Sequence, residues 1–196
     1  MTDRAAPSQS VRVDLEHARP ASPPPPAPGF RDVFETEFSY VHHTLCRLGV
    51  RHPDLEDLTH DVFVAVHRGL PEYDPTRPLR PWLFGIAFRV ASDYRRRARY
   101  AREIPGEPRA EPVDGAPPAD EQLASEQTRR LVLEALDDVE LDRRAVLILH
   151  DIDGRAMPEI AQALSIPLNT GYSRLRLARE QFKAAVHRLR LRRGEP

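Results

Sequence analysis

Four cations and several small polar side chains share one short stretch near the C-terminus, IPLNTGYSRLRLAREQFKAA (residues 166–185). If this stretch is a helix, its first backbone amides can bind phosphate and its first exposed side chains can hydrogen-bond to base edges. The pattern therefore indicates DNA as the ligand, and a solvated arginine face on an ordinary bundle helix is the alternative. The candidate base-reading residues are Asn169, Thr170, Tyr172, Ser173, Arg174 and Arg176, and the candidate backbone-binding residues are Arg179 and Lys183.

The residues before this stretch supply the element that would hold such a helix against DNA. Pro158 to Leu164 predicts a short helix, Ser165-Ile166-Pro167 ends it, and Asn169 is a good N-cap for the basic helix. A short helix, a tight turn and a longer basic helix form a helix-turn-helix, whose second helix enters the major groove. Leu175 and Ala178 are expected in the core. Two helices, 142–150 and 122–138, are expected before an Asp153-Gly154 turn.

The charges of the whole chain are segregated, although its formal net charge is only −1 over 196 residues. Residues 89–99 carry five arginines against one aspartate, and 172–193 carry seven arginines and one lysine against one glutamate. Between them, the proline-rich stretch 103–127 carries seven acidic residues and one arginine. Two cationic surfaces joined by an anionic connector indicate a protein that binds a polyanion at two places.

These stretches divide the chain into four parts. Residues 1–29 end in ASPPPPAPG and have too few apolar residues for a core, so we expect a disordered extension. Residues 101–121 are expected to form a flexible acidic, proline-rich linker. The blocks 30–100 and 122–193 have helical periodicity and no strand pattern. The expected fold class is all-α, with two small helical domains and a C-terminal helix-turn-helix.

The first block should contain one helix with an acidic face and one with a basic face. Asp54 is the expected N-cap of the first, which has an apolar stripe from Leu55 to Leu70. A second helix is expected to open at Pro81, with Leu83, Ile86, Ala87, Val90 and Tyr94 on its apolar face. Its opposite face carries Gly85, Arg89, Ser92, Arg96 and Arg99.

The bulk composition excludes several classes of protein. No apolar run approaches the ~20 residues that a membrane span requires, and the N-terminus has no secretory core, so no membrane insertion is expected. The single cysteine, Cys46, excludes an internal disulfide framework and fits a cytoplasmic location.

Three segments together resemble the bacterial RNA polymerase sigma factors of the extracytoplasmic-function type, in the sigma-70 family. They are DLEDLTHDVFVAVHRGL (54–70), YDPTRPLRPWLFGIAFRVASDYRRR (73–97) and MPEIAQALSIPLNTGYSRLRLAR (157–179). The order of the three segments, with an acidic spacer between the last two, makes the resemblance specific. It implies a non-enzymatic initiation factor that binds core RNA polymerase and recognises the minus-10 and minus-35 promoter elements, with no cofactor and no metal.

The resemblance also implies roles for individual residues. The helix matching 54–70 would bind the clamp of the largest polymerase subunit through Asp57, His60 and Asp61, with Phe63 on a neighbouring face. The helix-turn-helix would read the minus-35 element and contact the polymerase flap, and an anti-sigma protein would hold the factor inactive. Opening of the minus-10 element needs cations for the single-stranded backbone. The residues expected to supply them are Arg77, Arg80, Arg89, Arg95, Arg96, Arg97 and Arg99.

Aromatic residues and departures from the family pattern add two expectations. Trp82 and Phe84 could stack on flipped bases, but a core position at the start of the helix is favoured for Trp82. Gly171 stands where the family usually has valine or a similar residue, so we expect either a loose first turn or an unusually close approach to DNA or a neighbour. His60 and Arg89 stand where glutamine and asparagine are common in the family, which bears on promoter preference.

Two other functions compete with this interpretation. A helix-turn-helix regulator that never binds core polymerase would explain the C-terminal block, but it has no need for the tandem helices of the first block. A metal-dependent phosphohydrolase is suggested by His60-Asp61 and His150-Asp151, although such a site needs further ligands that converge on one metal.

Overall fold

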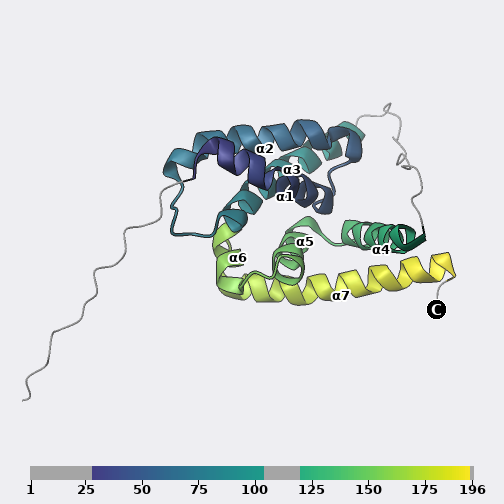
Figure 1. Cartoon of the computed structure of the whole chain (residues 1–196). Coiled ribbons are helices and arrows are strands. Elements are labelled where there is room, and N and C mark those ends of the chain that lie inside the picture. Colours follow the sequence, from purple (N-terminus) through teal and green to yellow (C-terminus); the bar gives the residue numbers. More distant parts are fainter. Residues whose placement is uncertain (1–27, 104–119, 195–196) are drawn as a thin grey trace, which may run out of the picture.

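The computed structural model describes residues 28–103 and 120–194, so most of the expected extension and linker lie outside the described residues. The described residues form helices and no strand, which confirms the all-α prediction. Figure 1 shows two layers, with α1 to α3 in one and α4 to α7 in the other. Nowhere in these two ranges is a helix both long enough and apolar enough to cross a bilayer.

The N-terminal bundle consists of three helices joined by short turns. They are α1 (Phe30–Arg47), α2 (Leu55–Gly69) and α3 (Leu79–Glu103), with 3-10 turns at His52–Asp54 and Leu70–Glu72. The apolar stripe of α2 is buried from Leu55 to Val66, as its spacing predicts. Helix α3 begins two residues before Pro81, which still lies in the first turn, where its missing N–H costs nothing. Asp54 does occupy the N-cap position of α2, but its carboxylate accepts a hydrogen bond from the Tyr94 hydroxyl (2.7 Å) rather than capping the helix.

The C-terminal bundle is formed by α4 (Asp120–Asp137), α5 (Leu141–Leu147), a π-helix (Ile148–Ile152), α6 (Met157–Ala163) and α7 (Leu168–Arg193). The expected single helix 142–150 is therefore wrong in its second half, where the coil widens. The amide of Asp153 donates to the carbonyl of Ile148 (2.9 Å), the five-residue step of a π-helix. The predicted Asp153-Gly154 turn follows, with Gly154 at φ +67°.

The turn of the helix-turn-helix is a Schellman motif. The amide of Ile166 donates to the carbonyl of Ala161 (2.9 Å), and that of Ser165 to Gln162 (3.2 Å). Ser165 takes the left-handed position at φ +54°, which glycine usually occupies. Helix α7 then starts two residues earlier than predicted, because Pro167 rather than Asn169 is the extended N-cap residue, and Asn169 lies inside the first turn.

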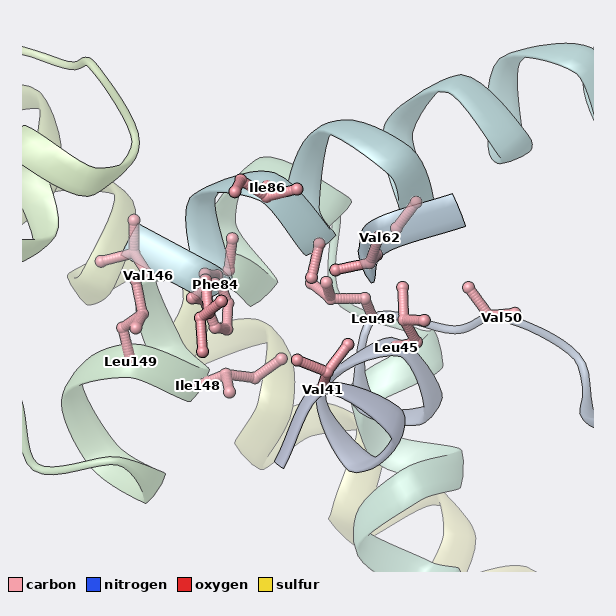
Figure 2. Close-up of a cluster of buried hydrophobic side chains, with 14 of the residues drawn as sticks. Val41, Leu45, Leu48, Val50, Val62, Phe84, Ile86, Val146, Ile148 and Leu149 are labelled. Atoms are coloured by element: carbon pink, nitrogen blue, oxygen red, sulfur yellow. The ribbon is translucent and has the colours of Figure 1, made fainter. Parts of the chain in front are cut away.

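One hydrophobic cluster runs through both bundles. It joins Val41, Leu45 and Phe84 of the first bundle to Ile148 and Leu149 of the second. Figure 2 shows Phe84 beside Val146, Ile148 and Leu149 at the junction. Burial of a side chain of this size contributes about 1.5–3 kcal/mol, so a few such residues hold the bundles together.

Polar contacts reinforce this junction. The hydroxyl of Tyr40 donates to Asp153 (2.7 Å), and the guanidinium of Arg47 lies 3.5 Å from the same carboxylate. Arg144 is fully buried and donates to Asp137 and to backbone carbonyls, and burial lowers its pKa to about 10. A Cβ atom on Gly49 (φ +87°) would lie 2.4 Å from its guanidinium, so only glycine fits there.

Candidate nucleic-acid interface

Helix α7 presents one face to the core and the opposite face to solvent. Leu175 and Ala178 are buried, as predicted. Of the residues that the sequence selects as DNA contacts, six are exposed and recur at helical spacing, so they share a face that runs from the first turn. They are Asn169, Tyr172, Ser173, Arg176, Arg179 and Lys183. Thr170 and Arg174 lie on the flank toward α5 and are partly buried.

The close approach expected at Gly171 is made to a neighbouring side chain. Gly171 is buried, and a Cβ atom there would lie 2.6 Å from Sδ of Met157 on α6. Its absence lets α6 and α7 pack at short range. The first turn of α7 is regular, since the amide of Gly171 donates to the carbonyl of Pro167 (3.1 Å).

Two of the expected DNA-binding arginines are tied to carboxylates of the preceding helices. Arg174 donates to Asp142 at the start of α5 (2.6 Å), and its side chain is only 26% exposed. Arg179 donates twice to Asp151 of the π-helix (2.6 and 2.9 Å). The hydrogen bond from Arg179 lowers the pKa of the Asp151 carboxyl below its ordinary value. These pairs fix α7 on the bundle, whereas the pair that Arg176 forms with Glu180 lies on its own exposed face (2.7 Å).

Arg143 is a candidate that the sequence interpretation missed. It lines a hollow of about 430 Å³ between the start of α5 and the first turns of α7, together with Asn169, Ser173 and Arg174. Its guanidinium lies 3.1 Å from Glu140. Sequence offers no signal for this residue, because it becomes part of the α7 surface only when the two helices pack.

The cations expected at the minus-10 element do not form a single surface. Arg80 turns toward α1, where it donates to Glu37 (2.9 Å) and lies 5.1 Å from the Tyr40 ring centroid. Arg95 is near Gly49 on another side of α3. Arg96 is exposed and pairs with Asp93 (2.9 Å), and Arg97 is exposed. The side chain of Arg99 lies outside the described residues.

The remaining two, Arg77 and Arg89, flank a hollow of about 230 Å³ between the bundles. Its walls are the loop before α3, the first turns of α3 and the end of α6. Trp82 lines it while packing on Tyr73 (4.8 Å between ring centroids), and Phe84 is wholly buried, so neither ring projects freely into solvent. A Cβ atom on Gly85 would lie 2.6 Å from the carbonyl oxygen of Ala163, so α6 covers this part of α3.

The acidic face of α2 is accessible. Asp57, His60 and Asp61 are exposed on it. Phe63 is not part of that surface: it is only 2% exposed, because the rings of Phe34 and Phe38 on α1 cover it. Helical spacing alone places Phe63 beside the acidic face, and packing of α1 removes it from solvent.

The His150-Asp151 pair of the π-helix is engaged in other contacts. His150 contacts Asp151 (2.7 Å), whose carboxylate also accepts two hydrogen bonds from Arg179. Among the described residues, no three His, Cys, Asp or Glu side chains gather in a group that could hold a metal ion. The geometry of the described residues therefore gives no support to the alternative of a metal-dependent phosphohydrolase.

Two sequence families match the two bundles. Sigma-70 region 2 matches residues 33–100, and Sigma-70 region 4 matches residues 129–182. The sigma factor CarQ of Myxococcus xanthus is 32% identical over 152 residues, which cover 76% of this chain and 83% of CarQ. The chain belongs to the sigma-70 family, as an extracytoplasmic-function sigma factor.

Other relatives of this sigma factor agree. CnrH of Cupriavidus metallidurans is 28% identical over 145 residues, covering 70% of this chain and 76% of CnrH. The solved structure of CnrH with the cytosolic domain of CnrY has a TM-score of 0.56 and 25% identity, covering 81% of this chain and 87% of the other. A sigma factor RpoE, solved with the anti-sigma factor NepR from Bartonella quintana, shares the fold with a TM-score of 0.61 and 20% identity, covering 81% and 96%.

The function follows from membership of the family. The sigma factor binds core RNA polymerase and directs promoter-specific transcription initiation. A plain helix-turn-helix regulator is not favoured, because region 2 is present alongside region 4.

Proposed function

We propose that the exposed face of α7 reads the minus-35 element, that α3 and the loop before it bind the minus-10 element, and that the acidic face of α2 binds the polymerase clamp. The observation that carries the proposal is the solvent-exposed polar and cationic face at the start of α7, in a helix-turn-helix. Arg176 is the best-placed cation on this face, at 67% side-chain exposure. The factor catalyses no reaction itself, needs no cofactor or metal, and acts in the cytoplasm.

Within this division of roles, Arg174 and Arg179 serve differently from Arg176. Their guanidinium groups already hold α7 on α5 and on the π-helix. An arginine that keeps such a pair neutralises less phosphate charge, so we assign phosphate binding mainly to Arg176 and Lys183. Arg143 joins them from the start of α5.

Promoter binding also requires the two bundles to separate. The two promoter elements lie about 25 base pairs apart, which is ~85 Å at ~3.4 Å per base pair. Helix α7, with 26 residues, is only ~39 Å long at 1.5 Å per residue, which is less than half the distance between the two promoter elements. The end of α6 also covers α3 at Gly85, beside Arg77 and Arg89. The packed arrangement is therefore a closed state, and core polymerase or an anti-sigma protein would select between closed and open states.

An anti-sigma protein is the expected inhibitory partner. RpoE, which shares this fold, was solved with the anti-sigma factor NepR, and CnrH was solved with the cytosolic domain of CnrY. In this chain a hollow of about 630 Å³ lies where α1, α4 and the π-helix meet, lined by residues of both bundles. Tyr40, Val132 and Ile152 give it apolar walls, and Arg47 and Arg129 lie among its lining residues. A helix with apolar and acidic side chains could occupy it and stabilise the closed state.

Transcription in vitro tests the proposal directly. Purified factor is added to core polymerase and genomic DNA, and the start sites are mapped. Start sites that share two sequence elements at a fixed spacing are the expected result. A factor that fails to co-elute with core polymerase at low ionic strength, with no inhibitor present, would overturn it.

A further inference from the structure

The N-terminal turns of α7 carry two large apolar side chains that are exposed to solvent. Leu168 is 44% exposed and Tyr172 is 55% exposed. They are four residues apart in the first turns of α7, so their side chains are neighbours on one side of the helix. Among the described residues, the hydrophobic cluster that joins the helices includes neither of them, so core packing does not account for this pair.

The surroundings of the pair match duplex DNA. Asn169 and Ser173 lie beside it with hydrogen-bonding groups, and Arg176 lies one turn further along with its guanidinium exposed. Cations along the same exposed face complement the phosphate charge on either side of a groove. An apolar pair within such a face would meet the floor of the major groove, where the C5-methyl group of thymine is the apolar feature.

We propose that Leu168 and Tyr172 form a subsite for thymine methyl groups, and that this subsite gives the factor a preference for thymine within its minus-35 element. The inference rests on the proposed role of α7 at that element. Methyl contact, rather than hydrogen bonding, is assigned to Tyr172, because its ring supplies the apolar area beside Leu168. Asn169 and Ser173 read the neighbouring polar positions, and Arg176 binds phosphate one turn further along.

The test uses templates that differ by a single methyl group. Holoenzyme reconstituted from the full chain and core polymerase selects its promoter from a randomised library, and the minus-35 element is remade with deoxyuridine in place of each thymine in turn. Replacement at one or two adjacent positions should lower open-complex formation by about 4-fold for each methyl contacted, the fold-change that corresponds to burial of one CH₂ group. Replacement outside the element should have no effect.

Variants then assign the effect to these side chains. Tyr172→Ala should bring the ratio of open-complex formation on thymine templates to that on uracil templates close to one. Leu168→Ala should lower the same ratio. Tyr172→Phe should keep the ratio, because the ring remains. Leu191→Ala is the matched control: this residue is 64% exposed near the other end of the same helix, and the change should leave the ratio unaltered.

Three results would overturn the inference. One is the same activity on thymine and uracil templates at every position of the element. Another is an equal loss of activity on both templates in Tyr172→Ala and Leu168→Ala, which would mean that the pair contacts polymerase protein. The third is loss of the ratio in Tyr172→Phe, which would assign the hydroxyl as the reader. Failure of the wild-type holoenzyme to select any promoter would refute the proposed function itself.

Discussion

Replacement of Gly85 by alanine tests whether the contact between α3 and α6 holds the sigma factor closed. The new Cβ atom would lie 2.6 Å from the carbonyl oxygen of Ala163, against about 3.4 Å for an ordinary contact. The bundles must therefore move apart by roughly 0.8 Å at this point, because a backbone carbonyl in a helix cannot turn aside. Overpacking of this kind costs about 1–3 kcal/mol.

The change also raises the intrinsic stability of α3, and this effect can be separated from the first. Alanine favours a helix over glycine by about 1 kcal/mol. That gain is the same whether the bundles are packed or apart, so it cancels in the balance between the two states. The ratio of open to closed molecules should therefore rise by about 5- to 150-fold in Gly85→Ala.

A fluorophore pair on exposed positions of α2 and of the C-terminal end of α7 would report this balance as a change in energy transfer. Gly69→Ala is the matched control, because it adds a methyl group to α2 that meets only the Trp82 ring (3.3 Å) within the same bundle. If Gly85→Ala and Gly69→Ala give the same distance distribution as the parent protein, the contact with Ala163 does not hold the bundles together and the reasoning is refuted.

Four further changes test other parts of the structure. Replacement of Asp57 and Asp61 by asparagine should weaken co-elution with core polymerase and leave DNA binding by the free chain intact; retained core affinity would refute the α2 assignment. Arg176→Ala should lower minus-35-dependent initiation and reduce the log–log salt slope of DNA binding by about 0.9, with core association unchanged. Gly49→Ala should lower the melting temperature by several degrees, because alanine at a positive φ alone costs about 1–2 kcal/mol and the added methyl group meets a buried guanidinium; an unchanged melting curve would contradict this. Asp151→Asn should destabilise the protein at neutral pH but less so in acid, because the Asp151 carboxyl has a lowered pKa in the folded protein. Its contribution to the free energy of unfolding is complete above the pKa of an unfolded aspartate and is lost as the pH falls through the pKa of the folded protein. Urea unfolding at pH 7 and below pH 4 checks the sign.

Much of the fold could be predicted from the sequence, because helix periodicity is local. The stripe of α2, the break at Ser165-Ile166-Pro167 and the helix-turn-helix all depend on residues within two or three turns of one another. The errors are also local in origin. Helix α7 starts at Leu168 because Pro167 is the N-cap residue, and the helix after Leu141 widens into a π-helix where a regular α-helix was expected.

The candidate site could be predicted in part. The exposed face of α7 follows from its sequence, as does the acidic face of α2. The burial of Phe63 could not be predicted, because it depends on Phe34 and Phe38 of α1, far back in the chain. The pairing of Arg179 with Asp151 likewise depends on the packing of α7 against the π-helix.

The sequence by itself determined the helices, their polar and apolar faces, the segregation of charge and the family of the chain. Only the tertiary structure decided which cations remain available on α7, which aromatic rings are covered, and that the two bundles share a core with α6 lying over Gly85. The physical reason is one of range. A helix and its faces are set by backbone hydrogen bonds and side-chain spacing within a few residues, whereas burial and ion pairing depend on partners that the chain brings together from far apart.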